Sequence, residues 1–208
     1  MCLFLINFSS NAHSQYVNDN SASTTVIPNS YATVGGTGAF TGPFSTLART
    51  YQWLINANQL TTMVGNNIVS LAMRIPTSSA ANWPTADVTF TNFDIYIGPG
   101  RAPASRSLTF DSNFTGTKTL VRSGSLVITA NSYTFGGTPN AFGPAITFTT
   151  PYLYSGGDLL VEMRHSGFVG TTRTNDAILT STGGYGTDFT LAGRAAIPGP
   201  WVCRVTFV

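Results

Sequence analysis

The chain has 208 residues, of which 42% are apolar and only 9% are charged, and its formal net charge is +2. An average soluble domain carries about 25% charged residues. The small net charge and the lack of any Lys/Arg cluster exclude a surface that follows nucleic-acid phosphates. No apolar run approaches the roughly 18 residues that a transmembrane helix needs, so we expect no membrane span.

Residues 1–14 begin with the apolar sequence CLFLINF and can be interpreted in two ways. As a signal peptide, they offer the small-x-small sequence AHS before Gln15, although they lack a basic region in front of the apolar one. As a retained strand, they would be an aggregation hazard unless paired, for example by addition to a neighbouring subunit. The residues of this assembly strand would be Leu3, Phe4, Leu5, Ile6 and Phe8.

Residues 15–48 are rich in Ser, Asn and Gly and predict an extended lead-in with one strand. The first clear strand candidate after it is RTYQWLI, residues 49–55. Residues 56–65 predict a short helical turn that ends at Gly65, where a residue without a Cβ is favoured.

Apolar and polar residues alternate over 67–75 and again over 88–98, which predicts strands. In the first segment Val69, Leu71, Met73 and Ile75 share one face. In the second, Phe93, Ile95 and Ile97 do. The remaining strand candidates are 108–116, 118–128 around Gly124, two pieces within 133–150, 158–165 and 201–208.

Short strands separated by Gly, Pro, Asn and Ser turns, with no long helix, predict an all-β fold. We expect residues 49–208 to form a single jelly-roll-like antiparallel β-sandwich, with 1–48 as an extended N-terminal segment.

Several segments resemble a loose group of secreted, planctomycete-like bacterial surface proteins with a jelly-roll-like module. They are QLTTMVGNNIVSLAMRI, FDIYIG, LVRSGSLVI and ITFTTPYLYSGGDLLVEMRHSG, within residues 49–170. Their shared features are turn glycines and core alternation. The resemblance implies an extracellular sandwich attached to a cell surface or matrix, and it transfers no catalytic residue or assigned activity.

The residues themselves offer little for catalysis. His13 lies in the N-terminal stretch, and His165 shares a strand face with apolar residues, which favours a structural role. Glu162 is the only glutamate, and we expect it to form a surface ion pair with Arg164. The chain has no GxSxG, HExxH or CxxC motif. We therefore expect a protein that is not an enzyme.

Asp87, Asp94 and Asp111 fall near predicted strand ends. They could bind a structural Ca²⁺ from separate loops, but capping turns is the favoured interpretation. No other cofactor is expected. The sequences NFS at Asn7 and NFT at Asn113 match glycosylation sequons.

Exposed aromatic rings could stack on sugars, and four lie beside glycines or prolines. These candidate ligand-binding aromatics are Trp83, Tyr152, Tyr154 and Tyr185. The two cysteines, Cys2 and Cys203, could form a disulfide in an oxidising compartment. Cys203 shares a face with Val205 and Phe207, which also suits a buried free thiol.

The leading hypothesis is a non-enzymatic, secreted structural protein whose copies assemble into a surface filament or layer. It rests on the sparse charge and the apolar N-terminus. The alternative is a module that binds extracellular polysaccharide, with Ca²⁺ as a structural ion. A viral capsid protein fits the fold class, but the chain lacks a basic arm.

Overall fold

The computed structural model describes residues 22–193 and 202–207. The strands of its two large sheets are all connected through antiparallel pairs. The four-stranded sheet has the order β1 (Ser23–Ile27), β13 (Cys203–Phe207), β4 (Asn67–Met73) and β9 (Ile146–Leu153). The five-stranded sheet has the order β12 (Phe189–Gly193), β3 (Arg49–Ile55), β10 (Leu159–His165), β6 (Phe93–Pro99) and β7 (Thr119–Arg122).

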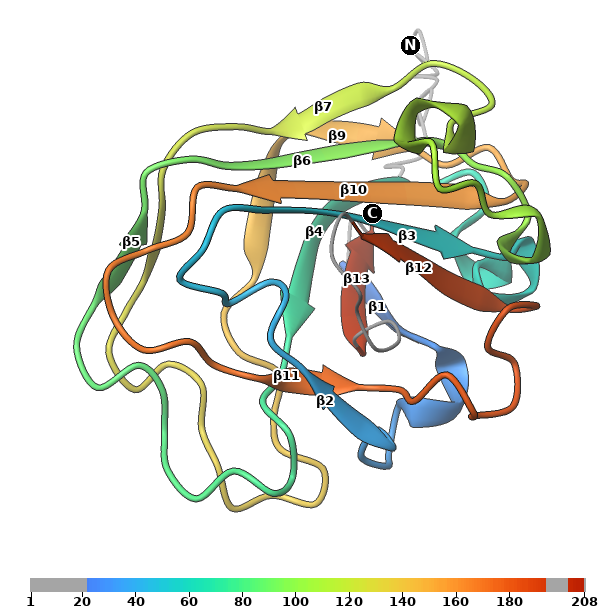
Figure 1. Ribbon diagram of the computed structural model, residues 1–208. Helices are drawn as coiled ribbons and strands as arrows, with labels where there is room; N and C mark the ends of the chain where they lie inside the picture. Colours follow the sequence, from blue (N-terminus) through green and yellow to red (C-terminus); the bar gives the residue numbers. More distant parts are fainter. Residues whose placement is uncertain (1–21, 194–201, 208) are drawn as a thin grey trace, which may run out of the picture.

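Two short pairs extend the fold away from the large sheets (Figure 1). They are β2 (Gly38–Phe40) with β11 (Asn175–Ala177), and β5 (Val88–Phe90) with β8 (Leu126–Ile128). The connections of the described part of the chain contain five 3₁₀ helices: η1 (Asn29–Tyr31), η2 (Ala57–Gln59), η3 (Thr61–Met63), η4 (Pro103–Ser105) and η5 (Phe110–Asn113).

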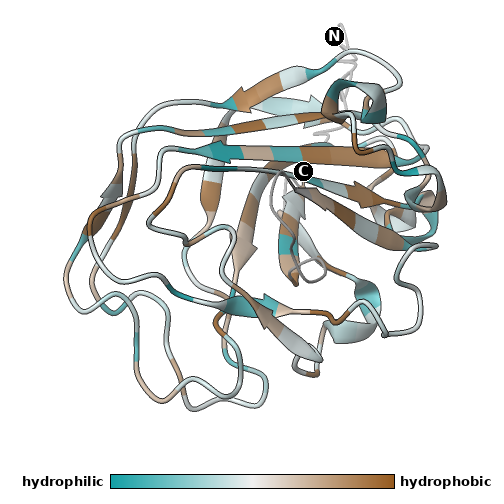
Figure 2. Cartoon of the chain, in the orientation of Figure 1, coloured by the Kyte–Doolittle hydropathy of each residue, from teal (hydrophilic) through white to brown (hydrophobic). Residues whose placement is uncertain are grey.

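The two large sheets pack on a shared core, so the molecule is an all-β sandwich. On β6 the predicted inner row of Phe93, Ile95 and Ile97 is buried, and on β13 Cys203 faces inward with Val205 and Phe207. Alternation places every second side chain on one face of a strand, which explains why sequence spacing could identify these rows. Figure 2 shows the most hydrophobic segments on the strands.

One predicted row was wrong in β4. The register of β4 against β9 shifts between Ile68 and Ser70, and Ile68, not Val69, joins Leu71 in the core. A bulge of this kind adds one residue and reverses the faces on one side of it. Simple alternation cannot reveal it.

Two further segments differ in detail from their predictions. Residues 108–116 were expected to be a strand, but they contain η5 and lie over the outer face of the five-stranded sheet. The turn at 56–65 consists of η2 and η3, and Gly65 follows with φ +82°, a conformation that favours glycine. In the part of the chain that the structure describes, no helix is long and apolar enough to span a membrane.

Candidate functional site

Glu162 lies on the outer face of β10 and is completely buried, so the expected surface position was wrong. The segment between β6 and β7, which contains η4 and η5, covers it. Glu162 directly opposes Gln52 of β3 on one side and Tyr96 of β6 on the other. A polar row therefore crosses the centre of the sheet beneath this covering segment.

Both oxygens of Glu162 are engaged. Oε1 accepts from Lys118 Nζ at 2.6 Å and from Arg164 Nε at 2.5 Å, and Oε2 accepts from Gln52 Nε2 at 2.6 Å. The predicted pair with Arg164 is thus present. Lys118 Nζ also lies 4.5 Å from the centre of the Tyr96 ring. One carboxylate is shared by two cations that reach solvent.

Gln52 connects this carboxylate to the covering segment. Its Nε2 also donates to the Phe110 carbonyl at 3.0 Å, and its Oε1 accepts from Asn113 Nδ2 at 2.8 Å. Asn113 is fully buried and donates a second time, to the Ser107 carbonyl. The Asn113 sequon therefore presents no accessible amide in this fold, because the same amide holds the cover in place.

The chemistry available to this cluster is limited. Glycoside hydrolysis uses two carboxyl groups on either side of the bond that breaks, whereas this cluster contributes one, held by three donors. Its three hydrogen-bond partners fix its position. The cluster therefore holds the segment between β6 and β7 against the five-stranded sheet.

The three aspartates considered for Ca²⁺ do not come together. Within residues 22–193 and 202–207 no group of three His, Cys, Asp or Glu side chains could hold a metal ion. Asp87 accepts from the Ala130 backbone N–H at 2.7 Å, and Asp94 accepts from Gly124 N–H at 3.2 Å. These two carboxylates therefore cap backbone turns, and Asp111 is exposed.

A second buried ion pair, which sequence reasoning missed, joins Arg74 and Asp176. The pair is 2.7 Å long, and the two side chains are 1% and 2% exposed. Asp176 also accepts from the Gly36 backbone N–H, where an added Cβ would lie 2.2 Å from the Ala177 carbonyl oxygen. Arg74 donates to the carbonyls of Tyr31 and Val34. The pair thus fastens the 31–36 segment to β11.

His165 ends the inner row of β10, as expected, and is held neutral. Its Nε2 lies 3.0 Å from the Gly42 carbonyl, and its Nδ1 accepts from the Gly167 N–H at 3.0 Å, which assigns the proton to Nε2. Burial, with Arg49 nearby, lowers the pKa of His165 to about 4. The Phe93 ring stacks on the imidazole. These contacts favour a structural histidine.

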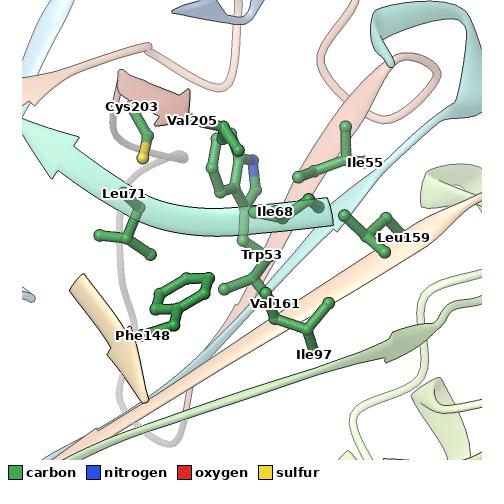
Figure 3. A pocket seen from close by; sticks show the side chains of 10 residues that line it. All are labelled: Trp53, Ile55, Ile68, Leu71, Ile97, Phe148, Leu159, Val161, Cys203 and Val205. Carbon is green, nitrogen blue, oxygen red and sulfur yellow. The ribbon is translucent and has the colours of Figure 1, made fainter. Parts of the chain in front are cut away.

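Cys203 is a free, buried thiol that faces a small void between the two sheets (Figure 3). The void measures about 10 Å³, close to one water-sized sphere. Burial raises the pKa of this thiol to about 12. The residues around the void are apolar apart from the thiol and the Trp53 indole: Trp53, Ile55, Ile68, Leu71, Ile97, Phe148, Leu159, Val161, Cys203 and Val205.

The candidate ligand-binding aromatics divide into two groups. Trp83 and Tyr154 are buried, Trp83 against Phe44, so neither ring can serve as a stacking platform and that part of the prediction was wrong. Tyr152 and Tyr185 are half-buried. Tyrosine and tryptophan supply large apolar areas to a core, and sequence spacing does not distinguish the two uses.

Several predicted residues lie outside the described part of the chain. They are Cys2, Asn7, His13 and the assembly-strand residues Leu3, Phe4, Leu5, Ile6 and Phe8. A Cys2–Cys203 disulfide stays a prediction, and it would require the Cys2 side chain to enter the sandwich.

Comparison with known proteins adds no relative: no family model, curated protein or solved structure matches this chain.

Proposed function

We propose that this protein is a non-enzymatic, extracellular structural subunit whose copies associate into a filament or layer. The observation that carries the proposal is the scarcity of exposed charge. Among the described residues, four charged residues belong to the exposed class, Asp87, Arg101, Arg106 and Asp111, and the other charged residues are half-buried or buried.

The fold lowers the number of charged side chains on the surface further, because it buries several of them. Arg74, Asp176, Glu162 and Arg122 are buried, and Arg122 donates to the Gly124 and Ser125 carbonyls. Three of the four exposed charges lie in the one segment that covers Glu162. Like charges on a surface keep copies of a protein apart, so a surface with few of them permits close association.

The test is sedimentation velocity of the full chain over a hundredfold range of concentration. We expect species larger than one chain to increase with concentration. The ionic strength should have little effect, because few exposed charges are available for screening. A chain that stays monomeric over the whole range would overturn the proposal.

The second candidate, a polysaccharide-binding module, is favoured by the partial exposure of Tyr152 and Tyr185. Tyrosine combines an apolar ring with a polar hydroxyl, and a half-buried tyrosine keeps part of its surface accessible to a ligand. Retention on immobilised polysaccharide should then fall at least tenfold in Tyr152→Ala or Tyr185→Ala, while Tyr31→Ala serves as the control at another half-buried tyrosine. Equal retention of all three variants would contradict this candidate.

A further inference from the structure

Within residues 22–193 and 202–207, three of the four outer edges of the two large sheets are occupied by other described groups. β7 and β9 lie side by side, and Thr149 Oγ1 donates to the Val121 carbonyl at 3.1 Å (Figure 1). On the β12 edge, the Phe189 carbonyl accepts from Gly186 N–H at 2.8 Å, and the Leu191 carbonyl accepts from Arg106 Nη1 at 2.5 Å. A further strand cannot pair where these groups are taken.

The β1 edge is different. Asn29 Nδ2 donates to the Val26 carbonyl at 2.9 Å, so Val26 directs its carbonyl away from β13. Outward and inward groups alternate along an antiparallel strand, and Thr24 is therefore the next residue whose N–H and C=O point outward. Ala22, Ser23 and Thr24 are exposed. No described residue forms a backbone bond with this outward side of Thr24.

The sequence of β1 also lacks the residues that usually protect an edge strand. It contains neither a charged residue nor a proline, and no charged residue occurs from Asn20 to Ala48. Natural sheets guard open edges with lysine, proline or a covering segment, because an unguarded edge is a template for another strand. The exposed stretch from Ala22 to Thr24 has three residues. This is long enough to form a strand pair in this fold, because each of β2, β5, β8 and β11 also has three residues.

We propose that the β1 edge of one copy accepts residues 3–8 of a second copy as an added strand. This inference rests on the proposed function and identifies its interface. The segment LFLINF is uncharged and has the length of an average strand. The main-chain bonds of an added strand give affinity without requiring charged contacts.

The length of the connecting chain permits the exchange. Fourteen residues, 9–22, separate the segment from β1 and span up to about 46 Å when extended. A domain of this size has a radius of gyration of about 16 Å. The donating segment and the accepting edge are different surfaces of the same chain. The contact is therefore head-to-tail and generates an open filament unless its rotation closes a ring.

The test compares three full-length variants by sedimentation velocity. Thr24→Pro removes the outward N–H and obstructs the edge without loss of a bond to β13, because this N–H points outward. Leu5→Asp places a charge in the donated segment. Thr24→Val keeps the edge N–H and the branched side chain and is the matched control. We expect wild type and Thr24→Val to assemble, and both Thr24→Pro and Leu5→Asp to remain monomeric. The thermal midpoints of all four should agree at a concentration low enough for wild type to be monomeric.

Mixing the two monomeric variants gives the decisive result. Leu5→Asp still has an open edge, and Thr24→Pro still has an intact segment, so a 1:1 mixture should form pairs and nothing longer. If wild type and Thr24→Pro assemble equally, the edge is wrong while the assembly proposal stands. If Leu5→Asp assembles like wild type, the occupant is wrong. If wild type never assembles, both proposals fail.

Discussion

The two buried carboxylates differ in how their counter-charges are arranged. Among the described residues Asp176 pairs with one cation, Arg74, and both side chains are almost completely hidden. Glu162 is equally hidden, but its cations, Lys118 and Arg164, are 24% and 44% exposed. When the Glu162 carboxylate is removed, Lys118 and Arg164 can be hydrated. When the Asp176 carboxylate is removed, the buried Arg74 cannot. Burial of the partner, more than burial of the acid, should therefore decide how much each site contributes to stability.

The strongest test of this comparison is Asp176→Asn. The variant leaves the Arg74 charge buried without a counter-charge, and we expect it to lower the free energy of unfolding by about 3–5 kcal/mol. Urea titration at pH 7 measures the change. Asp111→Asn, at an exposed aspartate, should change the same quantity by less than about 0.5 kcal/mol. Similar losses in the two variants would show that the buried Arg74–Asp176 pair contributes no more to stability than an exposed aspartate.

His165, which is buried and neutral, makes the free energy of unfolding depend on pH. The pKa of His165 falls from 6.5 to about 4 on folding, so the unfolded chain takes up the proton first as the pH decreases. The stability contributed by His165 is complete above pH 6.5 and is lost as the pH falls towards 4. We expect a loss of about 2 kcal/mol between pH 7.5 and pH 5.

Urea midpoints across that window measure this loss. His165→Asn should remove most of the pH dependence above pH 5, where the ordinary carboxylates are still largely ionised. A variant with the same pH profile as wild type would assign the effect to another group.

The smaller effect expected at the other carboxylate is tested with Glu162→Gln. Glutamine keeps the shape and an oxygen for Lys118, and both cations can hydrate, so we expect a loss of about 1–2 kcal/mol. The same urea titration measures it. A loss as large as that of Asp176→Asn would show that exposure of the partner does not matter.

The smallest effects are expected for Lys118→Met and Arg164→Met. Each leaves the other cation on Oε1 of Glu162, and each should lower the free energy of unfolding by less than about 1 kcal/mol. The double variant leaves the buried carboxylate uncompensated and should lose about 3 kcal/mol, more than the sum of the single losses. Additive losses would mean that the two cations act independently.

The inner rows of the sandwich could be predicted because they depend on a local rule. In β6, β10 and β13 every second residue is apolar, and the structure buries those residues as expected. The same rule failed at Val69, because a bulge depends on the pairing with β9 and leaves no signal in β4 itself.

The polar clusters could not be predicted in the same way, because their members are far apart in sequence. Gln52 and Glu162 are 110 residues apart, and Arg74 and Asp176 are 102 apart. One local signal was available: Leu160 shares the outer face of β10 with Glu162, and an apolar residue there indicates that the face is covered. Because Glu162 lies on the same face as Leu160, this signal indicates that Glu162 is covered as well.

The buried thiol of Cys203 can report how fast the sandwich opens. Cys203 is the only cysteine in the described residues, its thiolate is suppressed, and reagents have no path to it while the sheets stay together. Modification of Cys203 must therefore wait until the sandwich opens. At high reagent concentration the labelling rate of Cys203 then equals the opening rate, so in a Cys2→Ser variant this one thiol reports the kinetic lifetime of the native state.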